Sequence, residues 1–333
     1  MIKVLVVDDS SFMRVKIRTL LESDPNIKVI GIARNGIEAL DKVLTLKPDV
    51  ITMDINMPDM SGITAVELIM KECPTPILMV SSLTYDGAKE TVIALEKGAI
   101  DYIHKDQLTS ELLVEKIYLA QNAVIKHPTQ RSIEPTHVSG VRKAFSVIGI
   151  GISTGGPKAL AKFMPEISSD IKASIVIAQH MPPIFTNSLA ERLNAISKIT
   201  VKEAKNGEPM HPGCAYICPG GMHMMIEKTG IISLYPRDVF PQYRFCPSAD
   251  ALMSSLSKTY GPKALCIIMT GMGSDGLIGI KEAKEHGSYI IAQSQDSSTI
   301  YGMPKAVIAN NLQDEIVHLD HMGERINQLC IEN

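Results

Sequence analysis

The sequence has none of the features that mark a membrane-spanning, secreted or nucleic-acid-binding protein. No apolar run approaches the roughly 20 residues that a helix needs to cross a bilayer. The opening residues, M-I-K-V-L-V-V-D-D, are too short and too acidic for a signal peptide. The formal net charge is −3, and there is no basic stripe or recognition-helix pattern. We therefore expect no insertion into a membrane and no nucleic-acid partner.

The sequence also lacks cysteine spacings typical of redox or zinc sites. Its 6 cysteines include no C-x-x-C pair, and several lie in apolar segments. This pattern predicts reduced, mostly buried thiols in a cytoplasmic protein. A metal site made by Cys214 and Cys218 with His211 or His223 is an alternative.

Length and composition indicate two globular domains. The chain has 333 residues, of which 45% are hydrophobic and 21% charged, and each half is long enough to bury a core. Residues 126–143 contain prolines, a glycine and isolated aliphatic side chains without a period. We interpret them as a linker between domains at 1–125 and 144–333. Whether Ile133 and Val138 are solvated or dock on a domain face is open.

The first domain alternates strands and helices five times. The expected strands are the apolar runs at residues 3–7, 29–33, 50–53, 77–80 and 100–103. Helical spacing occurs at residues 11–21 and about 110–125, and helices are expected in the other gaps. Five such units predict a flavodoxin-like, doubly wound parallel sheet with right-handed crossovers.

Polar side chains follow the strands of this domain at one edge. Asp8 and Asp9 follow the first strand and Asp54 follows the third. Ser81 ends the fourth strand and Lys105 follows the fifth. Because clustered carboxylates repel one another, a folded protein keeps them for a hard cation such as magnesium. Helix N-capping is the alternative for the aspartates, but it does not explain the hydroxyl and the ammonium.

The second domain is organised around Phe145–Pro157, F-S-V-I-G-I-G-I-S-T-G-G-P. This stretch predicts a buried strand at residues 146–150 that enters a glycine-rich turn presenting Ser153. Residues 151–155 match the pattern G-x-S-x-G. Two other interpretations are a tight turn without chemistry and a dinucleotide-binding fingerprint, although Thr154 stands at the third glycine position of the fingerprint.

Two further polar residues favour catalysis. His180 follows the apolar run 175–178, and Asp275 lies in the turn G-M-G-S-D-G after the run 264–270. Carboxyl ends of parallel strands meet at one edge of an α/β sheet. Ser153, His180 and Asp275 are therefore a candidate nucleophile, base and acid. Backbone amides of the glycine-rich turns are candidates for stabilising the oxyanion, without a particular amide being identified.

The rest of the second domain predicts a mainly parallel, doubly wound α/β sheet with an antiparallel excursion. Short β segments and turns occupy residues 200–235. Helices are expected at residues 186–196 and at residues 248–258, with Ser248 as the N-cap. Gly302 is expected to open the last clear helix.

Residues 1 to about 125 resemble a response-regulator receiver domain, on the motifs V-V-D-D-S, M-D-I-N-M-P-D-M-S-G, M-V-S-S and D-Y-I-H-K. The resemblance implies that Asp54 is the phosphoacceptor and that a histidine kinase is the phosphodonor. It also implies that Asp9, Asp54 and the backbone carbonyl of Asn56 hold Mg²⁺, with Asp8 assisting.

The receiver resemblance extends to the residues that sense the phosphoryl group. Ser81 and Tyr102 stand where receivers place their switch pair, and Lys105 stands where they place the phosphate-sensing lysine. Receivers usually have a proline after this lysine, whereas this chain has Asp106. We expect the missing proline to loosen the loop that aims Lys105, and the added acid to weaken phosphoryl retention.

Three motifs of the second domain together resemble the CheB family of chemotaxis protein-glutamate methylesterases. They are residues 149–156, 179–183 and 271–276. The resemblance covers residues 145 to about 320 and implies Ser153 as nucleophile, His180 as base and Asp275 as orienting acid. This order along the chain differs from that of α/β-hydrolases, so the G-x-S-x-G match does not indicate that fold.

The resemblance implies a phosphorylation-activated serine hydrolase without a cofactor at the hydrolase site. Its substrates would be glutamyl methyl esters and glutamine amides on methyl-accepting chemotaxis receptors, for sensory adaptation. One departure is Cys246 before Pro247, where the family more often has an arginine. Two alternatives are a hydrolase of another ester or amide and a phospho-switched receptor adaptor without catalysis. The intact serine, histidine and aspartate argue against the adaptor.

Overall fold

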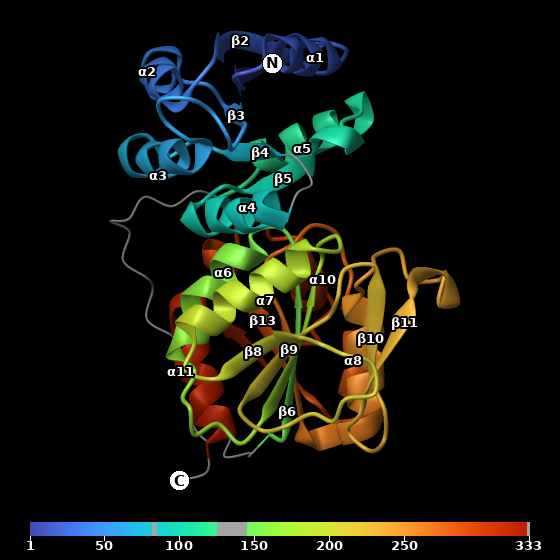
Figure 1. Ribbon diagram of the computed structural model, residues 1–333. Helices are drawn as coiled ribbons and strands as arrows, with labels where there is room; N and C mark the ends of the chain where they lie inside the picture. Colours follow the sequence, from blue (N-terminus) through green and yellow to red (C-terminus); the bar gives the residue numbers. More distant parts are fainter. Residues whose placement is uncertain (82–84, 125–144, 332–333) are drawn as a thin grey trace. The chain divides into compact units, whose positions relative to one another are not determined.

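The computed structural model divides into two compact units, Met1–Arg131 and Ser132–Asn333 (Figure 1). The described residues are 1–81, 85–124 and 145–331. The predicted linker, residues 126–143, lies outside them, so its boundaries stay a prediction. No helix among the described residues combines the length and apolar content that crossing a membrane requires.

The first unit contains a five-stranded parallel sheet with the strand order β2-β1-β3-β4-β5. Its strands are β1 (Ile2–Val7), β2 (Ile27–Ala33), β3 (Val50–Met53), β4 (Ile77–Ser81) and β5 (Asp101–His104). Its helices are α1 (Ser11–Leu21), α2 (Gly36–Leu46), α3 (Gly62–Glu72), α4 (Tyr85–Lys97) and α5 (Ser110–Gln121). Helices α1 and α5 pack together on one face and α2, α3 and α4 on the other. The predicted doubly wound receiver fold is confirmed.

The second unit contains a seven-stranded sheet with the order β14-β13-β12-β6-β7-β9-β8, in which every described pair is parallel. Its strands are β6 (Val147–Ile152), β7 (Ser174–Gln179), β8 (Thr200–Glu203), β9 (Cys214–Ile217), β12 (Ala264–Ile268), β13 (Tyr289–Gln293) and β14 (Glu315–Val317). Its helices are α6 (Gly156–Phe163), α7 (Phe185–Ile196), α8 (Ala249–Tyr260), α9 (Leu277–Glu285), α10 (Met303–Ala309) and α11 (Leu319–Cys330). Helices α8, α9 and α10 cover one face; α6, α7 and α11 group together on the other.

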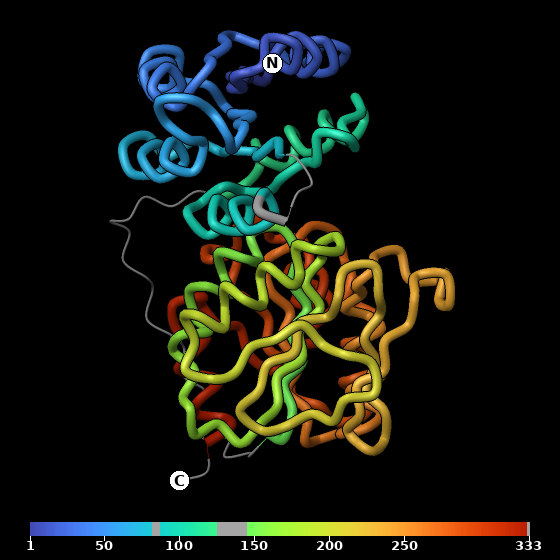
Figure 2. Tube along the Cα trace, in the orientation of Figure 1, coloured from blue at the N-terminus to red at the C-terminus, as the bar shows by residue number. Residues whose placement is uncertain are grey.

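Two parts of this unit differ from the sequence-based expectation. The antiparallel excursion consists of the hairpin β10 (Met222–Ile226) and β11 (Ile232–Pro236) with an antiparallel bridge between Pro209 and Ile231, and the hairpin is separate from the main sheet (Figure 2). Strands β8 and β9 join the main sheet in parallel, because β9 is buried along its whole length against β7. Helix α11 follows the helix expected to be the last. Its N-cap is His318, whose Nδ1 accepts a hydrogen bond from Asp320 N at 3.1 Å.

Both sheets change winding direction at one point, and polar loops lie there. In the first unit the chain passes from β1 out to β2 and returns to β3 on the other side of β1. In the second unit β6 is flanked by β7 on one side and by β12 on the other. Such reversals leave a crevice at the carboxyl ends of the strands, where α/β proteins bind their ligands.

Two glycines in β6 let helix α8 approach the sheet closely. A Cβ added at Gly149 would lie 2.7 Å from Leu256 Cδ2, and one added at Gly151 would lie 2.7 Å from Ala249 Cβ. The two glycines are two residues apart, so they share one face of the strand. Their role is therefore close helix packing rather than the turn itself, which begins after β6.

Gly151→Ala is expected to destabilise the second unit by about 1–3 kcal/mol. The added methyl meets Ala249 Cβ, which is attached directly to the backbone of α8 and moves only with the helix. Gly149→Ala is the matched control, because its methyl meets the ends of the flexible Leu256 and Met253 side chains. Differential scanning calorimetry of the full chain measures whether Gly151→Ala loses more stability than Gly149→Ala. Equal losses for both variants would contradict this account of the packing.

Candidate active site

The backbone of Ser153 is held by hydrogen bonds at both its N–H and its carbonyl group. Its N–H donates to Thr270 O at 2.9 Å, and its carbonyl accepts from Gly156 N at 2.8 Å and from Gln179 Nε2 at 3.0 Å. Gly155 has a φ of 80°, which turns the chain from β6 into α6. The side chain is thereby presented at the carboxyl end of β6, as the sequence predicted.

The structure brings Ser153, His180 and Asp275 together. His180 Nδ1 lies 3.1 Å from Ser153 Oγ, and His180 Nε2 lies 2.7 Å from Asp275 Oδ2. Because a carboxylate only accepts hydrogen bonds, Nε2 carries the proton and Nδ1 is left to accept the serine proton. The two ring nitrogens exchange the roles they have in chymotrypsin-type triads. The geometry is that of a serine nucleophile, a base and an orienting acid.

The Asp275 carboxylate lies at the N-terminus of helix α8. It accepts hydrogen bonds from Ser248 Oγ at 3.0 Å, Ala249 N at 2.7 Å and Asp250 N at 3.2 Å. Free N–H groups at a helix start bind anions, and the helix dipole adds to the attraction. Asp275 is only 7% exposed, so these donors replace the water that it loses. Ser248, expected only as a helix cap, also anchors the acid.

Two buried carboxylates next to each other have pKa values shifted in opposite directions. Burial alone would raise the pKa of Asp275, but the contact with His180 and the two α8 amides lower it. Burial and the neighbouring charge of Asp275 raise the pKa of Asp250 to about 6, although Gly279 N donates to Asp250 Oδ1 at 2.9 Å. Asp275 therefore stays ionised and continues to orient His180 in mildly acidic solution.

An aromatic ring that sequence reasoning did not identify covers the base. The Phe245 ring stacks on the His180 imidazole, with 4.6 Å between centroids and 10° between planes. Stacking restricts rotation of the imidazole and shields one of its faces from water. No sequence signal marks this residue, because the stack joins the loop before α8 to the turn after β7, which are far apart in the sequence.

Part of the glycine-rich turn is not available to stabilise an oxyanion. The N–H groups of Ser153 and Gly156 are already donated to the carbonyl oxygens of Thr270 and Ser153. The candidates for stabilising the oxyanion are therefore the other backbone N–H groups of the glycine-rich turns.

The receiver unit holds the predicted acidic cluster. One oxygen from each of Asp8, Asp9 and Asp54 lies within 4.8 Å of the others. Lys105 Nζ lies 2.8 Å from Asp54 Oδ2 and 3.0 Å from Asp8 Oδ2. Three carboxylates and one ammonium leave an excess of negative charge with hard oxygen ligands, which fits a divalent cation such as Mg²⁺. Among the described residues this is the group that is arranged to hold a metal, and it does not include the cysteines considered above.

The phosphoacceptor candidate is enclosed by charged and polar groups. Burial and the charge of Asp8 raise the pKa of Asp54, against the opposing effect of Lys105. Asn56 follows on the same loop, and its side-chain amide donates to Glu90 Oε2 at 3.0 Å. The expected metal ligand at Asn56 is its backbone carbonyl, which this side-chain bond does not occupy. Its role as a ligand stays a prediction.

The residues expected to sense the phosphoryl group lie on neighbouring strands. Tyr102 is opposite Met79 and Ser81 is opposite His104, so the side chains of Ser81 and Tyr102 project from the same face of the sheet. Both are buried, and Ser81 Oγ accepts a hydrogen bond from Thr91 Oγ1 at 3.0 Å. Their role as a switch pair stays a prediction.

Asp106 has a structural role that a proline could not take. Its N–H donates to His104 Nδ1 at 3.1 Å, so the His104 side chain caps the turn that carries Lys105. A proline at this position has no N–H and could not form this hydrogen bond. The Asp106 side chain is 91% exposed, so solvent screens much of its charge.

Asp250→Asn is expected to change how stability depends on pH. The pKa of Asp250 is raised from 3.8 to about 6 in the folded chain, so the stabilisation from its bound proton is complete below pH 3.8 and lost as pH rises through about 6. The free energy of unfolding of the variant minus that of the parent should increase across this window and then level off. Denaturant titrations at a series of pH values measure it.

The matched control is Asp170→Asn, which makes the same chemical change at an exposed position. It separates the effect of the Asp→Asn exchange itself from the effect of burial. If the free energy of unfolding of Asp250→Asn minus that of the parent did not change with pH, the raised pKa of Asp250 would be contradicted.

Comparison with known proteins places the site in a family. Residues 148–326 match the family model described as CheB methylesterase, and residues 4–118 match the response regulator receiver domain. The chain is 43% identical to a protein-glutamate methylesterase/protein-glutamine glutaminase of Lawsonia intracellularis, over 98% of each chain. It is also 43% identical to one of Halalkalibacterium halodurans, over 99% of this chain and 98% of the relative.

A solved structure extends the agreement to the second unit. The CheB methylesterase catalytic domain of Thermotoga maritima is 35% identical with a TM-score of 0.52, and the match covers 55% of this chain and 97% of that domain. The matches to sequence and structure agree with the resemblance drawn from the motifs. The chain belongs to the CheB methylesterase family and carries a response-regulator receiver domain ahead of its methylesterase domain.

Proposed function

We propose that this protein removes methyl groups from glutamyl methyl esters, and ammonia from glutamine side chains, of a protein substrate. The observation that carries the proposal is the contact of His180 with both Ser153 and Asp275 at the carboxyl edge of the sheet. The relatives' names, protein-glutamate methylesterase/protein-glutamine glutaminase, support the substrate chemistry.

The reaction follows from the hydrogen bonds of the site. Ser153 Oγ attacks the ester carbonyl while its proton moves to His180 Nδ1, and Asp275 stabilises the imidazolium through Nε2. His180 then protonates the departing methoxide, so methanol leaves and an acyl group remains on Ser153. Water, deprotonated by His180, attacks the acyl group, and glutamate is released. With a glutamine substrate, ammonia leaves in place of methanol.

The proposed substrates are methyl-accepting chemotaxis receptors, and the proposed phosphodonor is the chemotaxis histidine kinase. This follows from membership of a chemotaxis family with a receiver domain. The six free cysteines support a reducing compartment, which we take to be the cytoplasm.

Phosphorylation of Asp54 is the proposed control. Asp8, Asp9 and Asp54, with the carbonyl of Asn56, would hold Mg²⁺, which neutralises charge on the phosphoryl group when bound. Lys105 already contacts the Asp54 carboxylate at 2.8 Å, so it is placed to meet the added negative charge. Ser81 and Tyr102 are the proposed switch pair.

A hydrolase of another ester or amide would use the same three residues, because the triad does not set substrate choice. A receptor adaptor without catalysis would not need His180 held between Ser153 and Asp275. The assembled hydrogen-bond chain therefore favours an enzyme.

Ser153→Ala is expected to lower the chemical step by about a million-fold, judging from serine-protease triads. The assay follows methanol released from methyl-labelled chemoreceptor membranes, with and without a small phosphodonor and Mg²⁺. The phosphodonor should raise the rate of the parent, by up to about 100-fold if activation shifts the active form from 1% to 99%.

Asp54→Asn supplies the control for regulation. It should keep the resting rate and lose the response to the phosphodonor, whereas Ser153→Ala should lose hydrolysis under both conditions. More than a few per cent of parental hydrolysis in Ser153→Ala would sink the assignment of the nucleophile.

A further inference from the structure

The loop of residues 237–246 joins β11 to α8 and borders the catalytic histidine; we refer to it as the rim loop. Its Phe245 stacks on His180 with 4.6 Å between ring centroids. The guanidinium carbon of Arg244 lies 5.5 Å from the centroid of the same phenyl ring. The guanidinium is thus within about 10 Å of the imidazole, a span of about three residues of extended chain.

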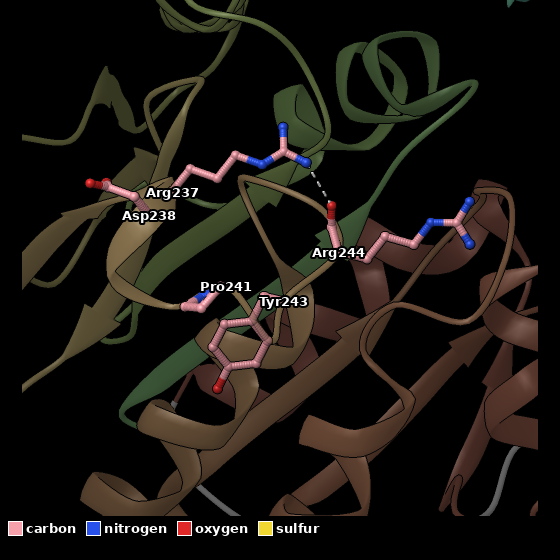
Figure 3. Close-up of a pocket in the computed structure, with 5 residues that line it drawn as sticks. All are labelled: Arg237, Asp238, Pro241, Tyr243 and Arg244. Atoms are coloured by element: carbon pink, nitrogen blue, oxygen red, sulfur yellow. Dashed lines mark hydrogen bonds between the residues drawn. The ribbon is translucent and has the colours of Figure 1, made fainter.

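Both arginines of the rim loop have unpaired charge. Within the part of the second unit that the structure describes, neither Arg237 nor Arg244 forms an ion pair with a carboxylate. Both are exposed. Arg237 Nη2 donates to the carbonyl oxygen of Arg244 at 3.0 Å, which braces the loop backbone (Figure 3). This bond holds the backbone from which the Arg244 side chain projects.

The rim loop also shapes a surface pocket of about 540 Å³. The pocket is lined by Arg237, Asp238, Pro241, Tyr243 and Arg244. Figure 3 shows that the carboxylate of Asp238 points to the opposite side from the Arg244 guanidinium. The local acid therefore leaves the Arg244 charge available to another carboxylate.

We propose that Arg244 is a specificity residue that binds a carboxylate flanking the reacting side chain of the substrate. The inference rests on the proposed esterase function and extends it to substrate sequence. The ester is neutral, so a cation near the site attracts a substrate only through its neighbouring residues. A guanidinium matches a carboxylate through two parallel N–H···O bonds. The favoured substrate is an acidic segment in which the target ester lies a few residues from an aspartate or glutamate.

The test compares two synthetic peptides of equal length, each with one glutamyl γ-methyl ester. One has aspartates flanking the ester, and the other has asparagines at the same positions. Methanol release by the full chain gives kcat/KM for each peptide. The parent should prefer the acidic peptide on the order of tenfold at low ionic strength, a typical effect of one charge-assisted pair, and salt should reduce this preference.

Arg244→Gln should bring the ratio of the two kcat/KM values close to one, and Arg244→Lys should give an intermediate ratio because lysine keeps the charge and loses the fork. The matched control is Lys228→Gln, an exposed cation in the turn between β10 and β11, at the end of the hairpin away from the rim loop. It removes the same charge and should preserve the ratio.

Three results would overturn the inference. They are a parent without preference, an Arg244→Gln variant that keeps the parental ratio, and a Lys228→Gln variant that loses it as completely. The salt dependence of the parent shows whether a charge acts at all, and Arg244→Lys, which keeps the charge and much of the side chain, tests the residue even if Arg244→Gln folds poorly. Failure of the esterase function itself would look different, since neither peptide would then release methanol in a Ser153-dependent way, and both proposals would fall.

Discussion

The buried negative charge of Asp275 is the constraint on which the geometry of the second unit depends. A carboxylate that is 7% exposed would lose too much hydration to stay ionised without compensating donors. Two α8 amides, the Ser248 hydroxyl and the His180 imidazole supply them. Those amides reach the carboxylate because glycines in β6 admit α8 to the sheet. His180 is thus oriented by the packing of α8 as well as by its direct contact with Asp275.

The two units use the same arrangement for different chemistry. Each places its candidate phosphoacceptor or nucleophile, Asp54 or Ser153, at the carboxyl ends of parallel strands, where the strand order reverses. In the first unit the loops bring three carboxylates and Lys105 together, which suits a cation and a phosphoryl group. In the second unit the loops bring a hydroxyl, an imidazole and one carboxylate together, which suits acyl transfer. The difference lies in the residues that end the strands.

The polar residues that follow the strands could be predicted from the sequence. Contacts that depend on how the loops pack could not. Ser153, His180 and Asp275 could be found because each follows an apolar run in a parallel sheet. The stacking of Phe245 on His180 and the second role of Ser248 could not be found, since both depend on the approach of α8 and the rim loop to turns far away in sequence. The same limit applies to β8 and β9, whose parallel pairing depends on which neighbour buries them. The bond from Asp106 N to His104 Nδ1 was also not predicted, because it depends on how the His104 side chain turns back onto the following backbone.

We propose that His180, held by Asp275, activates Ser153 as the nucleophile of the second unit. The most direct measurement is reaction of the full chain with an organofluorophosphonate, followed by intact-mass and peptide-mapping mass spectrometry. The account predicts one adduct per chain, carried by Ser153, and a strongly slowed reaction in His180→Gln. An adduct on another residue, or an unchanged rate in His180→Gln, would contradict it.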